Sequence, residues 1–259
     1  MTSPRPFPTI RRRDRPKNAR WAALIGYDGR GFHGFQRQPG QRTIEGELVQ
    51  LLQAMGLTGG LSFASRTDAG VHAVGQVIAF RAPDSLDANR LESEIVGRLP
   101  PDIRLGRLMP APAKFHPRWS AEGKVYRYEL SQESDDRAWR LEELDLPALE
   151  TAARLLREAP GLDGFTAPGA PAKAAPALTA LTVAPSSQGI TLTFEGPAFR
   201  RYAIRHMVGA LIACARGEST ADELRSLAAA TTPYRGLRAP AQGLTLVRVA
   251  YPSGLDPFA

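Results

Sequence analysis

Apolar residues follow two different spacings along this chain, and the order in which the spacings occur predicts an α+β fold. Short apolar runs indicate strands, whereas apolar positions three or four residues apart indicate helices. In the first half we expect strands at 21–26, 61–64, 74–80 and 103–108, with helices at 44–55 and 91–99. The resulting order, β-α-β-β-α-β, is that of the split β-α-β unit.

The second half approximates the same order with insertions. Strands are expected at 124–130, 178–183, 190–194 and 244–251, and helices at about 146–157, 204–215 and 220–229. An acidic connector at 133–145 and a Pro- and Ala-rich stretch at 168–176 interrupt the pattern. The two halves share no detectable sequence repeat. We nevertheless expect two RRM-like, or ferredoxin-like, halves whose antiparallel sheets join edge to edge around a central cleft.

The positive charge of the chain is concentrated at its start. The 259 residues carry a net charge of +7, but residues 1–20 alone hold seven basic residues and one acidic residue. We expect a disordered basic arm at 1–19, a first α+β half at 20–116, a second at 117–252 and a tail at 253–259. The arm could bind phosphates through counterion release or act as a solubilising tail.

Several classes of protein are not indicated by this sequence. No apolar run approaches the roughly 18 residues that a membrane span requires, and no apolar signal segment follows the basic start. The single cysteine, Cys214, lies in an apolar helical run, where we expect a small buried side chain. One cysteine excludes an internal disulfide and fits a reducing cytoplasm. The four histidines show no metal-ligand spacing.

The segment Gly29–Gly34 fits the GxGxxG pattern but not the dinucleotide site that this pattern can mark. That site needs a helix starting at the glycines, so that backbone amides meet the pyrophosphate. Here the first helix is expected only after Thr43, which is a plausible N-cap with Glu45 and Glu47 in the first turn. We interpret 29–38 as a surface loop that could touch RNA.

The most informative loop, Arg66–Val74, contains Asp68 between an arginine and a glycine. Two ordinary roles are open for this carboxylate, an Asx-turn or a helix N-cap. Arg66 could hold it ionised, and Gly70 permits a left-handed backbone that could bend the loop toward a cleft. An ionised aspartate at neutral pH is available as a base or a nucleophile.

Two other elements carry candidate site residues. On the strand at 124–130, Lys124, Tyr126 and Tyr128 share one face, which suits base stacking or simple burial in the core, with burial favoured for Tyr128. Arg201 and Arg205 begin an apolar helix four residues apart. An arginine that enters a buried helix needs a carboxylate partner, and Asp68 is a candidate.

These segments together resemble the TruA family, the bacterial tRNA pseudouridine synthases A, over about residues 20–252. The loop Arg66–His72 is the most specific piece of the resemblance. One motif departs from the family, since its usual FLYxMVR reads here as Phe199–Arg205 with arginines at 200 and 201. The family's GxHDF-like stretch is only weakly echoed at 161–165, and Thr245 stands where an aromatic residue is common. The other similar segments are Tyr27–Gly29, Gln36–Gln38, Leu99–Arg104, Phe115–Arg118, Lys124–Tyr128 and Ala239–Leu244.

The resemblance implies the pseudouridine synthase fold and an isomerase of tRNA. Its reaction converts uridine to pseudouridine in the anticodon stem-loop, at expected positions 38–40, without a cofactor or a metal. Asp68 would be the nucleophile or base and Arg205 its ion-pair partner. Tyr126 would stack on the flipped uracil, and Arg66 could occupy the space that the base leaves. The family is homodimeric, and His72 is expected to be structural. The expected cytoplasmic location comes from the single cysteine.

Two other functions remain open at this stage. The first is a non-catalytic RNA-binding protein with paired RRM-like halves, although the chain lacks a recognisable RNP1 aromatic run. The second is a hydrolase that uses Asp68 and His72 as an acid–base pair.

Overall fold

The computed structural model describes residues 18–57, 59–131, 136–141, 145–167, 176–187, 189–230, 232 and 234–259. The predicted basic arm, apart from its last two residues, lies outside these residues, as do residues 133–135 and 142–144 of the acidic connector and most of the Pro- and Ala-rich stretch. Within the described part of the chain, no helix is long and apolar enough to cross a membrane.

The first half has the predicted order of elements. Thr43 caps α1 as expected, because its side chain accepts a hydrogen bond from the amide of Gly46 at 3.2 Å. The second strand is shorter than predicted, with two residues, and the third begins earlier and is longer. The elements are β1 (Asn18–Tyr27), α1 (Ile44–Ala54), β2 (Ser62–Phe63), β3 (His72–Pro83), α2 (Ala88–Val96) and β4 (Ile103–Pro110).

The second half also has the predicted elements, with one strand added. The added strand, β6, pairs in parallel with the end of β5. Asp145 caps α3, and Thr220 with Glu223 forms a capping box at α5. The elements are β5 (Gly123–Ser131), β6 (Trp139–Arg140), α3 (Leu146–Glu158), η1 (Asp163–Phe165), β7 (Ala180–Ser186), β8 (Gly189–Gly196), α4 (Ala203–Ala215), α5 (Ala221–Ala229), η2 (Ala241–Gly243) and β9 (Leu244–Ala250).

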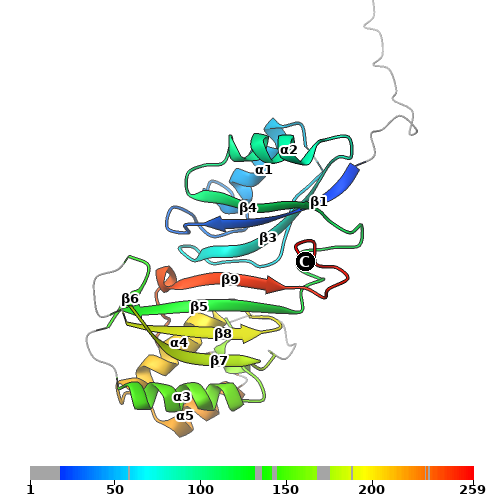
Figure 1. Ribbon diagram of the computed structural model, residues 1–259. Coiled ribbons are helices and arrows are strands. Elements are labelled where there is room, and N and C mark those ends of the chain that lie inside the picture. Colours follow the sequence, from blue (N-terminus) through cyan, green and yellow to red (C-terminus); the bar gives the residue numbers. More distant parts are fainter. Residues whose placement is uncertain are drawn as a thin grey trace, which may run out of the picture.

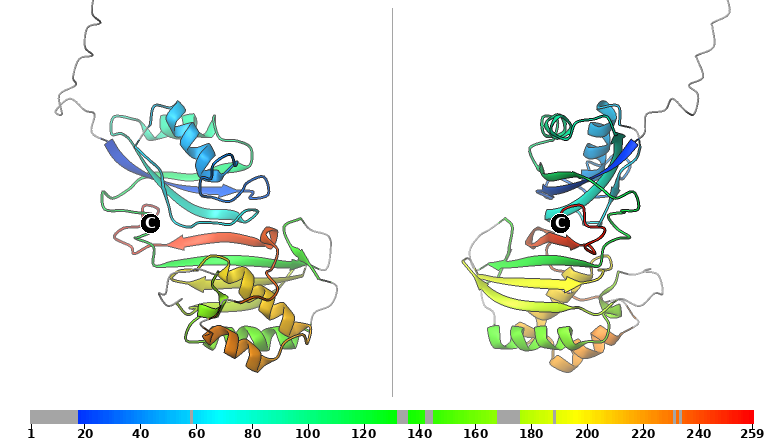
Figure 2. Two further views of the ribbon diagram at one scale, coloured as in Figure 1. Left: turned by 180° about the vertical axis from the view of Figure 1, so that it is seen from behind. Right: turned by 45° about the vertical axis from the view of Figure 1, so that its right-hand side comes forward.

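All strands belong to one sheet in the order β4-β1-β3-β9-β5-β8-β7, with β2 beside β3 and β6 beside β5 (Figure 1). The long strand pairs within each half are antiparallel, as predicted. The halves join where β3 meets β9 in parallel, with His72 opposite Thr245. Helices α1 and α2 lie toward the β4 end of the sheet, and α3, α4 and α5 toward the β7 end (Figure 2). The expected edge-to-edge joining is therefore confirmed.

Contacts beyond the strand pairing also tie the halves together. The ring of Phe115 from the first half packs edge-on against Tyr251 of the second half, with 5.0 Å between centroids. Near the C-terminus, the carbonyl of Phe258 accepts from Nη1 of Arg107 on β4 at 2.7 Å. These contacts fix the relative position of the two halves, which a site built from both requires.

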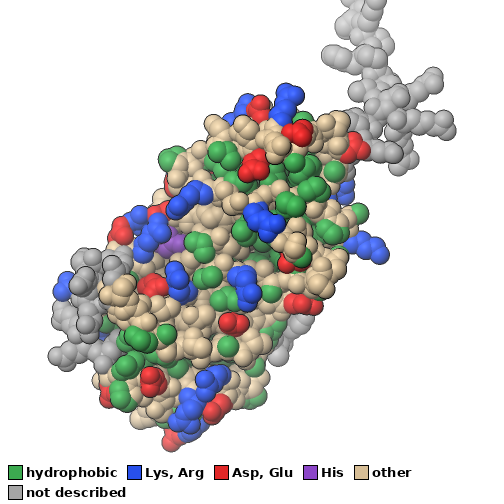
Figure 3. Space-filling view, in the orientation of Figure 1, with side chains coloured by type: hydrophobic (Ala, Val, Ile, Leu, Met, Phe, Trp, Pro, Cys, Tyr) green, Lys and Arg blue, Asp and Glu red, His purple; other side chains and the backbone are tan. Residues whose placement is uncertain are grey.

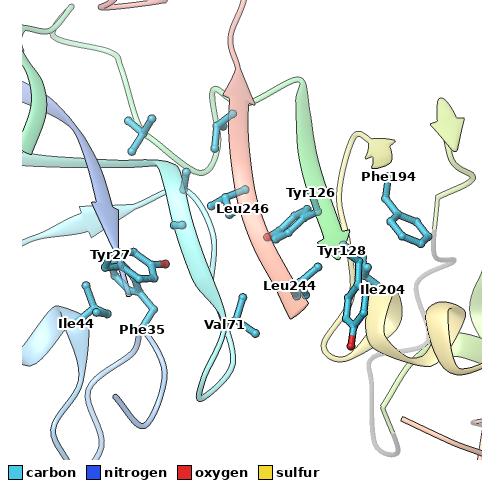
Figure 4. Close-up of a cluster of buried hydrophobic side chains, with 14 of the residues drawn as sticks. Tyr27, Phe35, Ile44, Val71, Tyr126, Tyr128, Phe194, Ile204, Leu244 and Leu246 are labelled. Atoms are coloured by element: carbon cyan, nitrogen blue, oxygen red, sulfur yellow. The ribbon is translucent and has the colours of Figure 1, made fainter. Parts of the chain in front are cut away.

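One apolar core extends through the sheet into both halves. Figure 4 shows Tyr126 and Tyr128 leaving β5 close to Leu244 on β9, while Tyr27 and Phe35 lie together in the first half. Tyr128 is fully buried, as the sequence favoured. Cys214 is only partly buried, so the expectation of a buried thiol was too strong.

Charged side chains of both signs are interspersed over the face seen in Figure 3. This mixture agrees with the nearly balanced charge of the chain after residue 20. A cationic binding site on the body must therefore come from the placement of particular arginines.

Candidate active site

A cleft of about 690 Å³ lies where the two halves meet. Its walls come from segments far apart in the sequence, so the fold and not local sequence assembles them. The first half contributes His33–Gln36, Gln38, Ala64–Ala69 and Val71, and the second contributes Arg118, Lys124, Tyr126, Phe199–Arg205 and Leu244.

Buried polar side chains hold the segment that leads into Asp68. Gln76, fully buried on β3, donates to the carbonyl of Ser65 at 2.7 Å and accepts from its amide at 3.1 Å. The hydroxyls of Thr67 and Tyr27 are hydrogen bonded at 2.8 Å. Because buried polar groups are costly to leave unpaired, these bonds define the conformation of the segment just before Asp68.

Two glycines let the backbone reach the geometry of this loop. Gly70 has a φ of 81°, so the left-handed turn predicted from the sequence is present. Gly34, from the loop at 29–38, has a φ of 93° and packs against the Asp68 peptide, where an added Cβ would lie 2.9 Å from the carbonyl oxygen of Thr67. The amide of Phe35 donates to that same carbonyl at 3.0 Å. The glycine-rich loop therefore supports the Asp68 loop as well as forming surface.

The carboxylate of Asp68 has few partners. Its side chain is 22% exposed, and Nη1 of Arg205 lies 3.5 Å from Oδ2, at the long limit of a hydrogen bond. Among the described residues it accepts no bond from a loop amide and caps no helix, so neither ordinary role of the aspartate applies. Burial raises the pKa of Asp68, while the positive charges of Arg205, Arg201 and Arg238 oppose that rise.

Arg205 is positioned by the segment that follows Arg238. Its Nε donates to the carbonyl of Ala239 at 2.8 Å, and its own carbonyl accepts from the Ala239 amide at 3.0 Å. The side chain is 11% exposed, and burial lowers the pKa of the guanidinium. A guanidinium remains charged even so, because its ordinary pKa lies far above neutrality. Arg205 therefore presents a fixed positive charge to Asp68.

Tyr126 and Lys124 bring the second half to the same loop. The Tyr126 hydroxyl is hydrogen bonded to Oγ of Ser65 at 2.7 Å, and burial raises the pKa of Tyr126 to about 12. Tyr126 as a whole is 5% exposed, and its ring meets Phe199 edge-on at 5.3 Å between centroids. Nζ of Lys124 donates to the carbonyl of Ala64 at 3.1 Å, and burial lowers the pKa of Lys124 to about 8.

The other two residues of interest in the loop lie apart from each other. Arg66 is exposed and lines the cleft. His72 is buried, accepts from the amide of Gly29 at 3.3 Å and has Nδ1 3.4 Å from Oδ1 of Asp28. No hydrogen bond or ion pair joins His72 to Asp68 in the described part of the chain. Within residues 18–259 as described, no cluster of three or more His, Cys, Asp or Glu side chains could hold a metal ion.

Comparison with known proteins supplies the family. A family model described as tRNA pseudouridine synthase matches residues 171–252, which include Arg205 and Ala239. A protein named tRNA pseudouridine synthase A from Shouchella clausii is 32% identical over 244 residues, covering 90% of this chain and 94% of the relative. One of the same name from Akkermansia muciniphila is 36% identical over 248 residues, covering 87% and 92%.

The chain belongs to the tRNA pseudouridine synthase A family. The alignments with these relatives extend over both halves, so the resemblance found in the sequence motifs applies to the whole sheet and to the cleft between its halves. The mixed α+β architecture with one large, mostly antiparallel sheet agrees with the fold expected of this family.

The motif in which this chain departs from the family has an unexpected geometry. Helix α4 begins at Ala203, and its N-cap residue, Tyr202, has a left-handed φ of 64°. Arg201 therefore precedes the helix, and the predicted i, i+4 arrangement of Arg201 and Arg205 on one helical face is wrong. The two side chains still approach each other, because both guanidiniums lie against the ring of Tyr202, at 4.6 and 5.8 Å from its centroid.

Several residues that shape the site in this family member were not identified from the sequence. Gln76 is the clearest case, since a polar residue inside the apolar run at 74–80 is a signal of a buried hydrogen-bonding role. Lys124 was placed on the correct strand, but its bond to Ala64 crosses between the halves. The contacts of Ala239 and Arg238 likewise depend on the packing of distant segments, which no local pattern shows.

Proposed function

We propose that this protein isomerises uridine to pseudouridine in tRNA, with Asp68 as the nucleophile or base. One observation carries the assignment of the residue. Asp68 faces a cleft formed by both halves, and within the described part of the chain its side chain has one long contact to a fixed arginine and no bond from a loop amide. The relatives named tRNA pseudouridine synthase A support the reaction and the substrate class.

The reaction balances without any added reactant. The N-glycosidic bond of the uridine breaks, the uracil turns, and a carbon–carbon bond to the same sugar forms, so the product is an isomer of the substrate. The ionised carboxylate of Asp68 would act at the sugar or at the ring. Arg205 keeps this carboxylate ionised, because its charge opposes the increase in the pKa that burial causes.

Tyr126 and Arg66 have complementary roles in this proposal. The ring of Tyr126 stacks on the extruded uracil, and its hydroxyl, already bonded to Ser65, remains protonated at neutral pH and is available for a later proton transfer. Arg66, exposed at the cleft, occupies the space that the base leaves. Extruding a base costs a few kcal/mol, which stacking and phosphate contacts must offset.

The site on the tRNA is proposed to be the anticodon stem-loop. Action as a homodimer in the cytoplasm completes the proposal. The homodimer follows from the resemblance to the family, and the cytoplasmic location from the single cysteine. Sedimentation of the purified protein over a range of concentrations tests the dimer directly.

The decisive experiment is incubation of the protein with unmodified tRNA, followed by mapping of pseudouridine at each position. We expect pseudouridine in the anticodon stem-loop with the wild-type protein and none with Asp68→Asn, which should still bind tRNA. Modification by Asp68→Asn at the wild-type rate would disprove the assigned role of Asp68.

The same incubation separates the two other functions. A non-catalytic RNA-binding protein would leave every uridine unchanged while binding the tRNA. A hydrolase would release free uracil or cleaved RNA, whereas an intact, isomerised tRNA excludes hydrolysis.

A further inference from the structure

Tyr202 is held in an unusual backbone conformation at the rim of the cleft. It is the one non-glycine residue with positive φ in the described part of the chain, at φ 64° and ψ −3°. A left-handed conformation costs a residue with a Cβ roughly 1–2 kcal/mol. The turn is closed by the amide of Ala203, which donates to the carbonyl of Arg200 at 3.1 Å. Such a cost at the start of a buried helix is a reason to ask what the side chain does.

Two arginine side chains pack against the ring of Tyr202. The guanidinium carbons of Arg201 and Arg238 lie 4.6 and 4.5 Å from its centroid, within cation–π range. Arg201 also donates from Nη2 to the Tyr202 hydroxyl at 2.6 Å. The ring therefore fixes two long side chains that would otherwise be free to rotate, which reduces the entropy lost when they bind a ligand.

In the part of the chain that the structure describes, no carboxylate lies close enough to these two arginines to neutralise them. Neither Arg201 nor Arg238 forms an ion pair within the described residues, and both are exposed. The charge of each arginine opposes the rise in the pKa of Asp68 that burial causes. Arg201 lines the cleft itself, and Arg238 directly precedes Ala239, which orients Arg205. Two unneutralised cations thus stand beside the reactive carboxylate.

We propose that Arg201 and Arg238, held against Tyr202, bind the sugar–phosphate backbone of the RNA next to the uridine that enters the cleft. The inference rests on the proposed function, since it names how that substrate is held. A planar guanidinium matches the oxygens of a phosphodiester, and exposed cations near the surface are suited to an anion that approaches from solvent. Arg201, which departs from the family motif, supplies half of this clamp in this chain.

The test is tRNA binding by the double variant Arg201→Ala/Arg238→Ala, measured over a range of salt concentrations. Each lost phosphate contact reduces the slope of log K against log salt by about 0.7–0.9, and affinity should fall on the order of tenfold at physiological salt. The matched control is Arg154→Ala/Arg225→Ala, which removes the same charge from the exposed faces of α3 and α5. The control should retain the wild-type slope.

A charge-preserving variant separates the two parts of the proposal. Arg201→Lys/Arg238→Lys keeps both cations but loses the planar groups, so the salt slope should remain while affinity falls only in part. Equal slopes for the alanine variant and the wild type, or an equal loss in the control, would overturn the inference. Binding does not require isomerisation, so this result is independent of whether the wild-type protein forms pseudouridine.

Discussion

Two aspartates in this protein lie in loops and are similarly exposed, but their pKa values are shifted in opposite directions. The side chain of Asp28, after β1, is 18% exposed, and that of Asp68, before β3, is 22% exposed. Hydrogen bonds from Arg30 and Arg137 hold the pKa of Asp28 well below its usual range, whereas burial raises the pKa of Asp68. The difference lies in the donors that surround each carboxylate.

Asp28 is nearly saturated with donors. Arg30 binds both of its oxygens, and Nη2 of Arg137, from the second half, lies 2.9 Å from Oδ2. Among the residues that the structure describes, the side chain of Asp68 has Arg205 as its one hydrogen-bond or ion-pair partner, at 3.5 Å. A carboxylate with several short bonds is stabilised as an ion and is unreactive, while one with few remains available to a substrate. We infer that Asp28 joins the two halves and that Asp68 serves the reaction.

The largest expected effect comes from removing the charge of Asp68. Asp68→Asn should lower pseudouridine formation by at least about 10³-fold, because the reactive group is lost. Its folding stability should stay the same or rise, since an ionised group with a raised pKa in the folded state costs stability at neutral pH. Single-turnover assays and thermal unfolding measure the two quantities. A large loss of stability with unchanged turnover would place Asp68 in the structural role assigned to Asp28.

Arg205→Ala should have the next largest effect. Turnover should fall by about 100-fold, since the carboxylate loses its fixed partner, while tRNA affinity changes much less. Without that charge the pKa of Asp68 rises further, so the acidic limb of the pH–rate profile should move to higher pH. Arg205→Lys keeps a positive charge, so its acidic limb should lie close to that of the wild-type protein. Parallel losses of stability and activity would instead indicate a structural ion pair.

The sequence was sufficient to predict the parts of this comparison that depend on local pattern. The alternation of apolar residues predicted both halves, Thr43 predicted the start of α1, and Gly70 predicted the left-handed turn beside Asp68. These signals are local because propensity, capping and backbone freedom act over a few residues. The pairing of Asp68 with Arg205 was anticipated because a buried arginine needs a partner.

What the sequence did not predict depends on contacts between distant segments. Arg137 approaches Asp28 across 109 positions, and β6, which follows it, was missed because a two-residue strand has no periodicity. The placement of Arg201 on the same helix as Arg205 was also wrong, because the helix begins only after Tyr202, which adopts a conformation that its side chain does not favour. Only the packing of both halves determines that Arg238 reaches the same ring as Arg201.

Asp28→Asn tests the other side of the comparison. Loss of the carboxylate charge between Arg30 and Arg137 should lower the free energy of unfolding by about 1–2 kcal/mol at neutral pH, a modest value because both arginines are nearly half exposed. Because the pKa of Asp28 is depressed in the folded state, this stabilisation is present above the unfolded pKa of about 3.9 and is lost as pH falls through and below it. Denaturant unfolding of wild type and variant at several pH values should converge in acid. Turnover well below the melting temperature should be nearly unchanged.

The smallest effect should come from the two arginines that act on Asp68 from a distance. In Arg201→Ala/Arg238→Ala the acidic limb should move to higher pH, because both charges oppose the rise in the pKa of Asp68, but by less than in Arg205→Ala. The graded order follows from geometry, since Arg205 is within hydrogen-bonding distance of the carboxylate and Arg201 and Arg238 are not. Measuring the limb at saturating tRNA separates this effect from weaker binding. If the acidic limb does not move, Arg201 and Arg238 do not influence the pKa of Asp68. Their role would then be limited to binding the RNA.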